Sequence, residues 1–76
     1  MKYQSIDPGR SGIRIRALRT ARGESGAALA KAVGVSASAV EMYENGKRIP
    51  RDEIKIRIAE HYQTPVEDIF YRLMHE

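Results

Sequence analysis

The sequence predicts an all-α fold, one small domain built from five helices, on three observations. The chain has 76 residues, of which 42% are hydrophobic and 30% charged, a composition typical of a folded domain rather than of a disordered chain. Apolar residues recur at helical spacing along most of its length. Residues that commonly begin and end helices stand between the apolar segments, and they indicate the helix boundaries.

The first ten residues are predicted to form a flexible N-terminal arm. They are mostly polar and contain Asp7-Pro8-Gly9, a turn signal. The first helix is expected over about residues 11–22, because Gly23 stands where a helix commonly ends in a left-handed residue. The side chains that should face inward are Ile15, Leu18 and Ala21.

Two short helices are predicted on either side of Gly34. Ser25 and Ser36 stand at their starts, where a serine hydroxyl can accept a hydrogen bond from the first turn. The second helix then ends near Val33, and the third spans about residues 37–45. The inward side chains of this segment are Leu29, Ala30, Val33, Val35, Val40 and Tyr43.

Gly34 itself supports a sharp change of direction between these two helices. A turn of this kind requires a positive φ, which Gly adopts without steric cost. Ala30 precedes Gly34 by four residues, and its small side chain lets the helices cross closely. The segment therefore predicts a helix-turn-helix, a motif whose second helix can lie in a major groove of DNA.

The fourth helix is predicted over about residues 51–62, after a connector that ends at Pro50. Asp52 and Glu53 occupy its first turn, where the helix dipole favours negative charge. The inward side chains of this helix are Ile54, Ile58 and Ala59.

The fifth helix is predicted to begin at Thr64-Pro65-Val66-Glu67, which has the pattern of a capping box, and to continue to about Leu73. Its inward side chains are Val66, Ile69 and Phe70. The domain then covers residues 11–73, and residues 74–76 form a short tail.

Two segments, residues 13–16 and 53–58, leave a second architecture open. Apolar and charged residues alternate in both, and alternation is typical of strands. They could instead form a two-stranded ribbon with helices between the strands, as in β-ribbon DNA-binding proteins. Both segments continue into helix-favouring residues without a turn signal, which favours helices.

The sequence argues against several classes of function. Because it has no cysteine, the chain has neither a disulfide nor a Cys-based zinc site, and no apolar run is long enough for a membrane span. Its start lacks the apolar region of a secretory signal, so we expect a cytoplasmic protein. His61 and His75 stand apart from any nucleophile, carboxylate pair or ligand spacing, so we expect no enzyme activity, metal or cofactor.

Basic residues concentrate in the first part of the chain. Residues 1–48 contain nine Lys and Arg against four Asp and Glu, whereas residues 49–76 contain four against six. The net charges are therefore +5 and −2, which add up to the total of +3. The positive part includes the predicted helix-turn-helix, as expected of a surface that faces phosphate groups.

Three sequence features identify the motif more closely. They are the spacing Ala30, Gly34, Val40, the segment Tyr43-Glu44-Asn45-Gly46-Lys47-Arg48, and the upstream pattern R-x-x-R-x-x-R-G at residues 16–23. Together, from about Gly12 to Phe70, they resemble the phage-repressor/Cro-like helix-turn-helix family of bacterial and phage regulators. The resemblance implies a lambda-repressor-like domain and a sequence-specific DNA-binding transcriptional regulator, most simply a repressor. Its third helix would lie in the major groove of an operator in double-stranded DNA.

The resemblance also implies roles for individual residues. In this family an Arg at the position of Arg19 commonly pairs with a Glu at the position of Glu44, which would fix the third helix against the first. Phosphate contacts are implied at the start of the second helix and after the third. The residues concerned are Ser25, Gly26, Asn45, Gly46, Lys47 and Arg48.

Base contacts are expected from the outer side of the third helix, at Ser36, Ala37, Ser38, Glu41 and Met42. The hydroxyls can bond to bases or phosphates, the carboxylate can accept a bond from a cytosine amino group, and the apolar side chains can pack on a thymine methyl. Family members often carry Gln, Arg, Lys or Thr at these positions and a Gln in place of Gly26. This chain therefore offers few hydrogen-bonding groups to bases.

We expect a homodimer, because one such module makes few base contacts and two half-sites about 34–36 Å apart multiply specificity. The predicted dimer surface is Ile69, Phe70, Leu73 and Met74, although packing inside the monomer would explain these side chains equally well. An alternative function is a protein-interaction module of the same fold, antitoxin-like or regulator-binding, with weak DNA binding. The sparse readout face and the acidic second part of the chain motivate this alternative.

Overall fold

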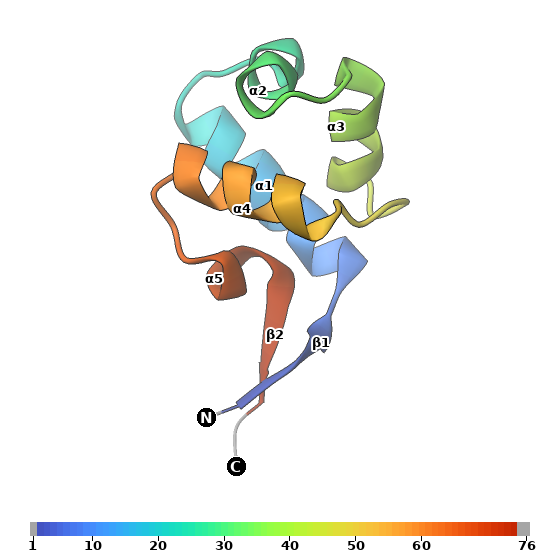
Figure 1. The fold of residues 1–76 in the computed structure, drawn as a ribbon, viewed down its shortest axis with the longest axis vertical. Helices are drawn as coiled ribbons and strands as arrows, with labels where there is room; N and C mark the ends of the chain where they lie inside the picture. The colour runs from blue at the N-terminus through green and yellow to red at the C-terminus, as the bar shows by residue number, and fades with distance from the viewer. Residues whose placement is uncertain (1, 75–76) are drawn as a thin grey trace.

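The computed structural model describes residues 2–74, with side chains over residues 7–71. Seven elements follow one another along the chain. They are β1 (Lys2–Ile6), α1 (Pro8–Ala21), α2 (Gly26–Val33), α3 (Ala37–Glu44), α4 (Asp52–His61), α5 (Val66–Phe70) and β2 (Tyr71–Met74). Figure 1 shows the helices gathered in one body, from which the two strands extend together to the ends of the chain.

The helix-turn-helix forms where the sequence predicts it, between α2 and α3. Gly34 lies between the two helices with a φ of 80°, in the left-handed region. Ser25 and Ser36 cap the helices, since each hydroxyl accepts a hydrogen bond at 3.0 Å from the backbone N–H three residues later. The five helices and their caps at this turn confirm the predicted fold class.

The core lies between α1, α2, α3 and α4, and α5 covers one end of it. Every inward side chain predicted for the second to fifth helices is buried or partly buried. In α1, Ile15 is fully buried and Leu18 partly, but Ala21 is exposed and its prediction is wrong. Ala21 follows Ile15 by six residues, which turns it about 120° away from the core side of the helix.

The sequence pattern does not predict the burial of two polar side chains, those of Ser11 and Lys55. Ser11 is 2% exposed and donates its hydroxyl to the carbonyl of Phe70 at 3.3 Å. Lys55 is 5% exposed, and its Nζ lies 3.0 Å from Oδ1 of Asp52. Both lie at the end of the helical body near α5 and β2, and their partners satisfy the buried polar groups.

Both ends of the helical region differ from the prediction. α1 begins at Pro8 rather than at residue 11 or 12, because the side chain of Asp7 accepts a hydrogen bond from Arg10 N at 3.1 Å and Pro suits the first helical position. The predicted turn signal is thus a helix start. The capping box at α5 does not form, since Thr64 Oγ1 donates to the Tyr62 carbonyl at 3.0 Å and Pro65 occupies the N-cap position.

A short antiparallel sheet replaces the predicted arm and the last turn of the fifth helix. Its register pairs Lys2 with Met74, Tyr3 with Leu73 and Ile6 with Tyr71, with an irregularity between Tyr3 and Ile6. Pairing between the two ends of a chain depends on the tertiary fold and leaves no local sequence signal. The two segments predicted as an alternative ribbon, residues 13–16 and 53–58, are helical, so that alternative is wrong.

The N-terminal half of α1 lies directly against the C-terminal end of α3. A Cβ built on Gly12 would come within 2.5 Å of the carbonyl oxygens of Tyr43 and Glu44. Gly46, with a φ of 72°, turns the chain beside Gly9 immediately after α3. This close crossing determines how α3 is presented to the solvent. Among the described residues, no helix is long and apolar enough to cross a bilayer.

Candidate nucleic-acid interface

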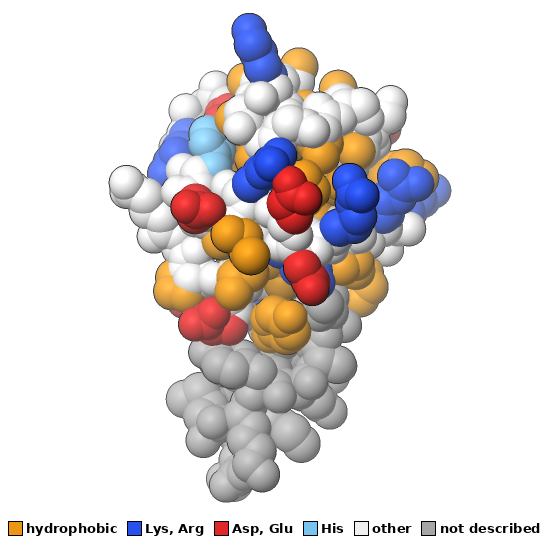
Figure 2. All heavy atoms as spheres, in the orientation of Figure 1, with side chains coloured by type: hydrophobic (Ala, Val, Ile, Leu, Met, Phe, Trp, Pro, Cys, Tyr) orange, Lys and Arg blue, Asp and Glu red, His pale blue; other side chains and the backbone are white. Residues whose placement is uncertain are grey.

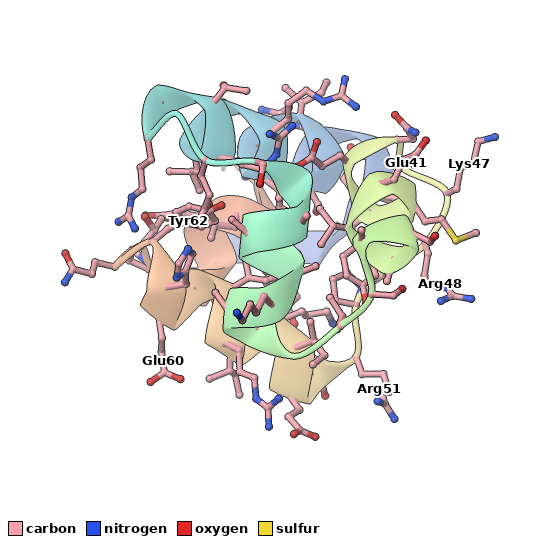
Figure 3. The ribbon with its side chains drawn as sticks, turned by 90° about the horizontal axis from the view of Figure 1, so that it is seen from above. Glu41, Lys47, Arg48, Arg51, Glu60 and Tyr62 are labelled. Atoms are coloured by element: carbon pink, nitrogen blue, oxygen red, sulfur yellow. The ribbon has the colours of Figure 1, made fainter. Side chains whose placement is uncertain are left out.

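The outer side of α3 faces solvent, and we call it the bare side of the helix; it consists of Ala37, Ser38, Glu41 and Met42. Ala37, Ser38 and Glu41 are exposed, and Met42 is 37% exposed although it is apolar. Figure 3 shows Glu41 directed outward from the helix, on the same side as the loop that follows α3. In the part of the chain with described side chains, neither Ser38 nor Glu41 has a side-chain partner.

Ser36 differs from the other predicted base-contacting residues. Its hydroxyl oxygen accepts the hydrogen bond from Ala39 N at 3.0 Å that caps α3. An oxygen held in this way keeps its own proton available, but its position is set by the helix start. The structure therefore assigns Ser36 first to the cap.

The inner side of α3 is held by a bidentate ion pair between Arg19 and Glu44. Arg19 Nε lies 2.6 Å from Glu44 Oε2, and Nη2 lies 3.0 Å from Oε1. Arg16, one turn earlier on α1, adds a third bond from Nε to Oε1 at 3.2 Å. The predicted pairing is present, and Arg16 joins it.

The Glu44 carboxylate is ionised in a nearly buried position. Its side chain is 5% exposed. Burial acts to raise the pKa of this carboxyl, but the hydrogen bonds and charges of Arg19 and Arg16 outweigh burial and hold the pKa below its ordinary value. A paired, hydrogen-bonded charge of this kind orients the two helices, and removal of Glu44 would leave the arginines on α1 without their counter-charge.

A second cluster fixes the loop before α2. Arg19 Nη1 donates to the carbonyl of Glu24 at 2.8 Å. The Glu24 carboxylate accepts from the hydroxyl of Tyr62 at 2.5 Å and lies 2.6 Å from Nε2 of His61. Arg22 completes the cluster, since its guanidinium lies 5.0 Å from the centre of the Tyr62 ring and donates to the His61 carbonyl at 2.9 Å.

The pKa values in this cluster follow from the same contacts. Burial favours the neutral form of Glu24, but hydrogen bonds from Tyr62 and His61 and the nearby positive charges lower the pKa of Glu24 below its ordinary value. For Tyr62, burial and the adjacent Glu24 both raise the pKa. The sequence does not indicate a partner for His61, because Glu24 lies 37 positions away along the chain.

Two potential phosphate-binding regions flank the bare side of α3. At one end, Ser25 caps α2 and is exposed, and Gly26, which has no side chain of its own, starts the helix. At the other, Asn45, Lys47 and Arg48 are exposed in the loop after α3. Figure 3 shows Lys47 and Arg48 projecting from this loop. Figure 2 shows basic side chains at the right edge of the helical body and others at its top, left and centre.

Asn45 has a partner that the sequence does not indicate. Arg16 Nη2 donates to Oδ1 of Asn45 at 2.9 Å, while the same guanidinium bonds to Glu44 through Nε. Asn45 also ends α3, where its backbone N–H donates to the carbonyl of Glu41 at 3.0 Å. Arg16 thus links the ion pair to one of the predicted phosphate-contacting residues.

A shallow hollow of about 430 Å³ opens beside the bare side of α3. Its lining residues are Arg16, Arg19, Gly26, Ala37, Val40, Glu41 and Glu44. A Cβ at Gly26 would meet only Val40 Cγ1, at 3.9 Å, so a side chain would fit here.

The predicted dimer surface is wrong for two of its four residues. Ile69 and Phe70 are each 1% exposed and belong to the core, because α5 turns its apolar side toward α1 and α4. Leu73 and Met74 lie in β2, where the structure describes the backbone alone. The large apolar side chains that remain exposed among residues 7–71 are Ile13, Met42 and Ile56.

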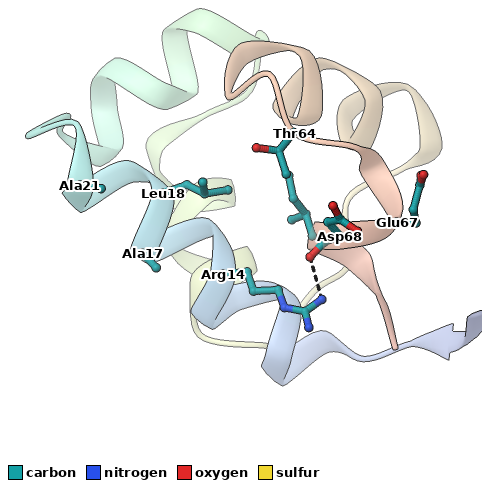
Figure 4. A pocket seen from close by; sticks show the side chains of 8 residues that line it. Arg14, Ala17, Leu18, Ala21, Thr64, Glu67 and Asp68 are labelled. Carbon is teal, nitrogen blue, oxygen red and sulfur yellow. Dashed lines mark hydrogen bonds between the residues drawn. The ribbon is translucent and has the colours of Figure 1, made fainter. Parts of the chain in front are cut away.

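An apolar groove of about 470 Å³ separates α1 from α5. Figure 4 shows Ala17, Leu18 and Ala21 on its α1 side, and Arg14 reaches across it to donate to the Asp68 carbonyl at 2.7 Å. The groove contains no histidine and no nucleophilic side chain other than Thr64. Among the described residues, no cluster of three or more His, Cys, Asp or Glu side chains could hold a metal ion.

Comparisons with known proteins agree on one kind of protein. The model of the family described as helix-turn-helix domain matches residues 11–69. The restriction-modification controller protein C.AhdI from Aeromonas hydrophila superposes with a TM-score of 0.77 at 31% identity, over 84% of this chain and 97% of that one. No significant match is found among curated protein sequences.

A repressor bound to its operator is also similar. The P22 c2 repressor, solved in complex with a synthetic operator, has a TM-score of 0.76 and 32% identity, over 78% of this chain and 89% of that one. The DNA-binding domain of BldD has a TM-score of 0.70 and 26% identity, over 84% and 93% of the two chains.

Proposed function

The chain belongs to the phage-repressor/Cro-like family of helix-turn-helix domains, and from this premise we propose how it acts as a DNA-binding transcriptional regulator. It inserts α3 (Ala37–Glu44) in the major groove of its operator and acts as a repressor. The P22 c2 relative, a repressor solved on a synthetic operator, supports this assignment. A protein-interaction module with weak DNA binding is not favoured.

One observation carries the proposal: α3 is fixed on its inner side and bare on its outer side. Glu44 binds two arginines of α1 with three hydrogen bonds, whereas the exposed side of the same helix offers unpartnered groups to a ligand. A rigid helix with a free outer side is what base recognition in a groove requires.

The phosphate contacts come from both sides of that helix. The free N–H groups at the start of α2, at Ser25 and Gly26, receive one strand. Asn45, Lys47 and Arg48 bind the other strand, and the positive φ of Gly46 brings its backbone close to it. These contacts hold the domain in register on the duplex and carry no sequence information of their own.

Base discrimination is the task of Ala37, Ser38, Glu41 and Met42. Ser38 offers a hydroxyl, Glu41 accepts from a cytosine amino group, and the two apolar side chains pack on thymine methyls. Ser36 contributes through its hydroxyl proton while its oxygen caps α3. We propose that specificity is shared with a second copy, because this set makes few direct hydrogen bonds to bases.

A homodimer on a pseudo-palindromic operator follows from that requirement. Two-fold symmetry in the protein matches half-sites about 34–36 Å apart on the DNA. Of the predicted dimer surface, Leu73 and Met74 in β2 remain candidates. Sedimentation at micromolar concentration should show a dimer, and a monomer at all concentrations would contradict this part of the proposal.

The experiment that tests DNA binding is fluorescence anisotropy with random-sequence duplex DNA across a salt series. Binding should weaken with salt, with a log–log slope of about −0.9 for each phosphate neutralised. In an Arg48→Ala variant the slope should shrink by about one phosphate, and affinity should fall alike for all sequences. Arg57→Ala is the matched control, because it removes the same charge from an arginine of α4 that binds Glu53 on its own helix and the Val33 carbonyl at the end of α2. A folded protein that does not bind duplex at low salt would contradict the proposed function.

A further inference from the structure

We infer that Arg16 is a positioning residue, which orients the side-chain amide of Asn45 toward a DNA phosphate. The inference rests on the proposed function, since it assigns a role within the phosphate contact after α3. It starts from one guanidinium that bonds to two successive residues, through Nε to Glu44 Oε1 at 3.2 Å and through Nη2 to Asn45 Oδ1 at 2.9 Å.

The chemistry of the two side chains determines which end of the amide faces outward. Arginine carries donors alone, so the amide atom that faces Arg16 must be the acceptor Oδ1. The NH₂ group of Asn45 then points away from Arg16. A phosphate carries acceptors alone, so this orientation is the one that can bind it, and the opposite orientation would present a carbonyl oxygen to a negative charge.

At Asn45 the side chain, and not the backbone, is the part of the residue that can change its conformation. The backbone is fixed, since Asn45 ends α3 with a hydrogen bond to the Glu41 carbonyl and Gly46 turns the chain immediately afterward. The side chain itself is exposed. Without Arg16 the amide would rotate freely in solvent, and binding a phosphate would require ordering it at an entropic cost.

Arg16 is itself held in place, which lets it orient another group. Its Nε is bound by a carboxylate that is also in the bidentate pair with Arg19. Arg16 and Arg19 are three residues apart on α1, so they lie on the same side of the helix. Glu44 thus fixes the guanidinium of Arg16, and this guanidinium in turn fixes the side-chain amide of Asn45.

A lysine at position 16 would keep the charge and lose this geometry. Its single ammonium cannot reproduce the planar fork that spans Glu44 and Asn45. The comparison between Arg16→Lys and wild type therefore separates the positioning role from a general contribution to the positive field. Arg16→Gln removes both.

The test is a double-mutant cycle on duplex binding, with Arg16→Lys, Asn45→Ala and the combination. Arg16→Lys should weaken binding by about two- to tenfold, the range that one net hydrogen bond represents. In the Asn45→Ala background the same change should have little further effect, because the group that Arg16 orients is gone. The salt slope should stay unchanged in Arg16→Lys. Equal losses from Arg16→Lys in both backgrounds, or wild-type affinity of Arg16→Lys, would overturn the inference.

A measurement on the free protein keeps the inference independent of DNA binding. In the wild type, NMR should show the Asn45 side-chain amide ordered on the picosecond to nanosecond timescale, and Arg16→Lys should make it mobile. Thermal unfolding of each variant reports any loss of the fold. Absence of duplex binding by the wild type would contradict the proposed function, whereas an Asn45 amide equally mobile in the wild type and in the Arg16→Lys variant would contradict the positioning role alone.

Discussion

The two sides of α3 differ in burial and in side-chain contacts. On the inner side Ala39, Val40, Tyr43 and Glu44 are all buried, and the carboxylate of Glu44 receives three hydrogen bonds from α1. On the outer side, Ser38 and Glu41 are exposed without partners among the described side chains. Under the proposed function, the inner side determines where the helix lies and the outer side determines which bases it binds.

The sharpest test of that separation compares Glu44→Ala with Glu41→Ala, two glutamates one turn apart on the same helix. Loss of Glu44 leaves two arginines facing each other without a counter-charge, and we expect about 3 kcal/mol of destabilisation, at the low end for broken buried pairs because Arg16 stays half-exposed. Loss of Glu41 should change stability by less than about 0.5 kcal/mol. Urea unfolding followed by circular dichroism measures both. Equal effects would show that the two sides of α3 are not distinct.

The crossing of α1 and α3 offers a second way to disturb the inner side alone. Gly12→Ala would place a Cβ 2.5 Å from two backbone carbonyl oxygens. A backbone cannot retreat as a flexible side chain can, so we expect about 2 kcal/mol of destabilisation from overpacking. Thermal unfolding would show it as a lower Tm.

Gly9→Ala is the matched control in the same helix. A Cβ at Gly9 would meet only Oδ1 of Asp7, at 3.6 Å, which is ordinary contact. Because Ala is the better helix former, this variant should be as stable as the wild type or slightly more so. A Gly12→Ala protein with unchanged Tm would mean that α1 and α3 can separate without cost.

Acid should weaken the ion pairs of the inner side. The folded protein holds the pKa values of Glu44 and Glu24 below their ordinary value of 4.5. A lowered folded-state pKa contributes stability that is complete above the unfolded value and is lost as pH falls through the folded value. The free energy of unfolding should therefore decline below about pH 4.5, by up to about 1.4 kcal/mol per pH unit for each proton taken up.

Two variants assign that acid dependence. Glu44→Gln should flatten the decline below about pH 4.5, whereas Glu41→Gln should leave it as it is. Tyr62 gives the opposite dependence at high pH, since its raised pKa contributes stability that is complete below pH 10 and is lost as pH rises through the folded value. An acid decline that is the same in the Glu44→Gln variant would show that the pair does not stabilise the fold.

What the sequence predicts well in this molecule is local. Ser25, Ser36 and Gly34 act within a few residues of themselves, so their caps and turn follow from the residue types alone. The Arg19–Glu44 pair spans 25 positions and is predictable only through the family resemblance.

What the sequence does not predict is long-range. The bonds of Arg16 to Asn45 and of His61 to Glu24 join residues 29 and 37 positions apart. The pairing of β1 with β2 likewise joins the two ends of the chain. Neither apolar periodicity nor capping residues indicate such contacts, because the contacts form only when the helices have packed together. Asp7-Pro8-Gly9 is a different case, because the same residues suit a turn and a helix start, and the capping bond decides between them.

The smallest expected effect on the protein itself is that of Ser38→Ala on the outer side of α3. Ser38 is exposed and unpartnered among the described side chains, so stability should stay within about 0.5 kcal/mol of wild type. On DNA the same change should alter the preference between sites, by about 1 kcal/mol at the base pair that the hydroxyl contacts. Site selection from a random duplex library, followed by competition between the preferred site and its single-base variants, measures that preference. Arg48→Ala in the same assay should lower affinity for every site alike. If Ser38→Ala instead weakened all sites equally, Ser38 would be a phosphate contact, and base discrimination would depend on Glu41, Ala37 and Met42.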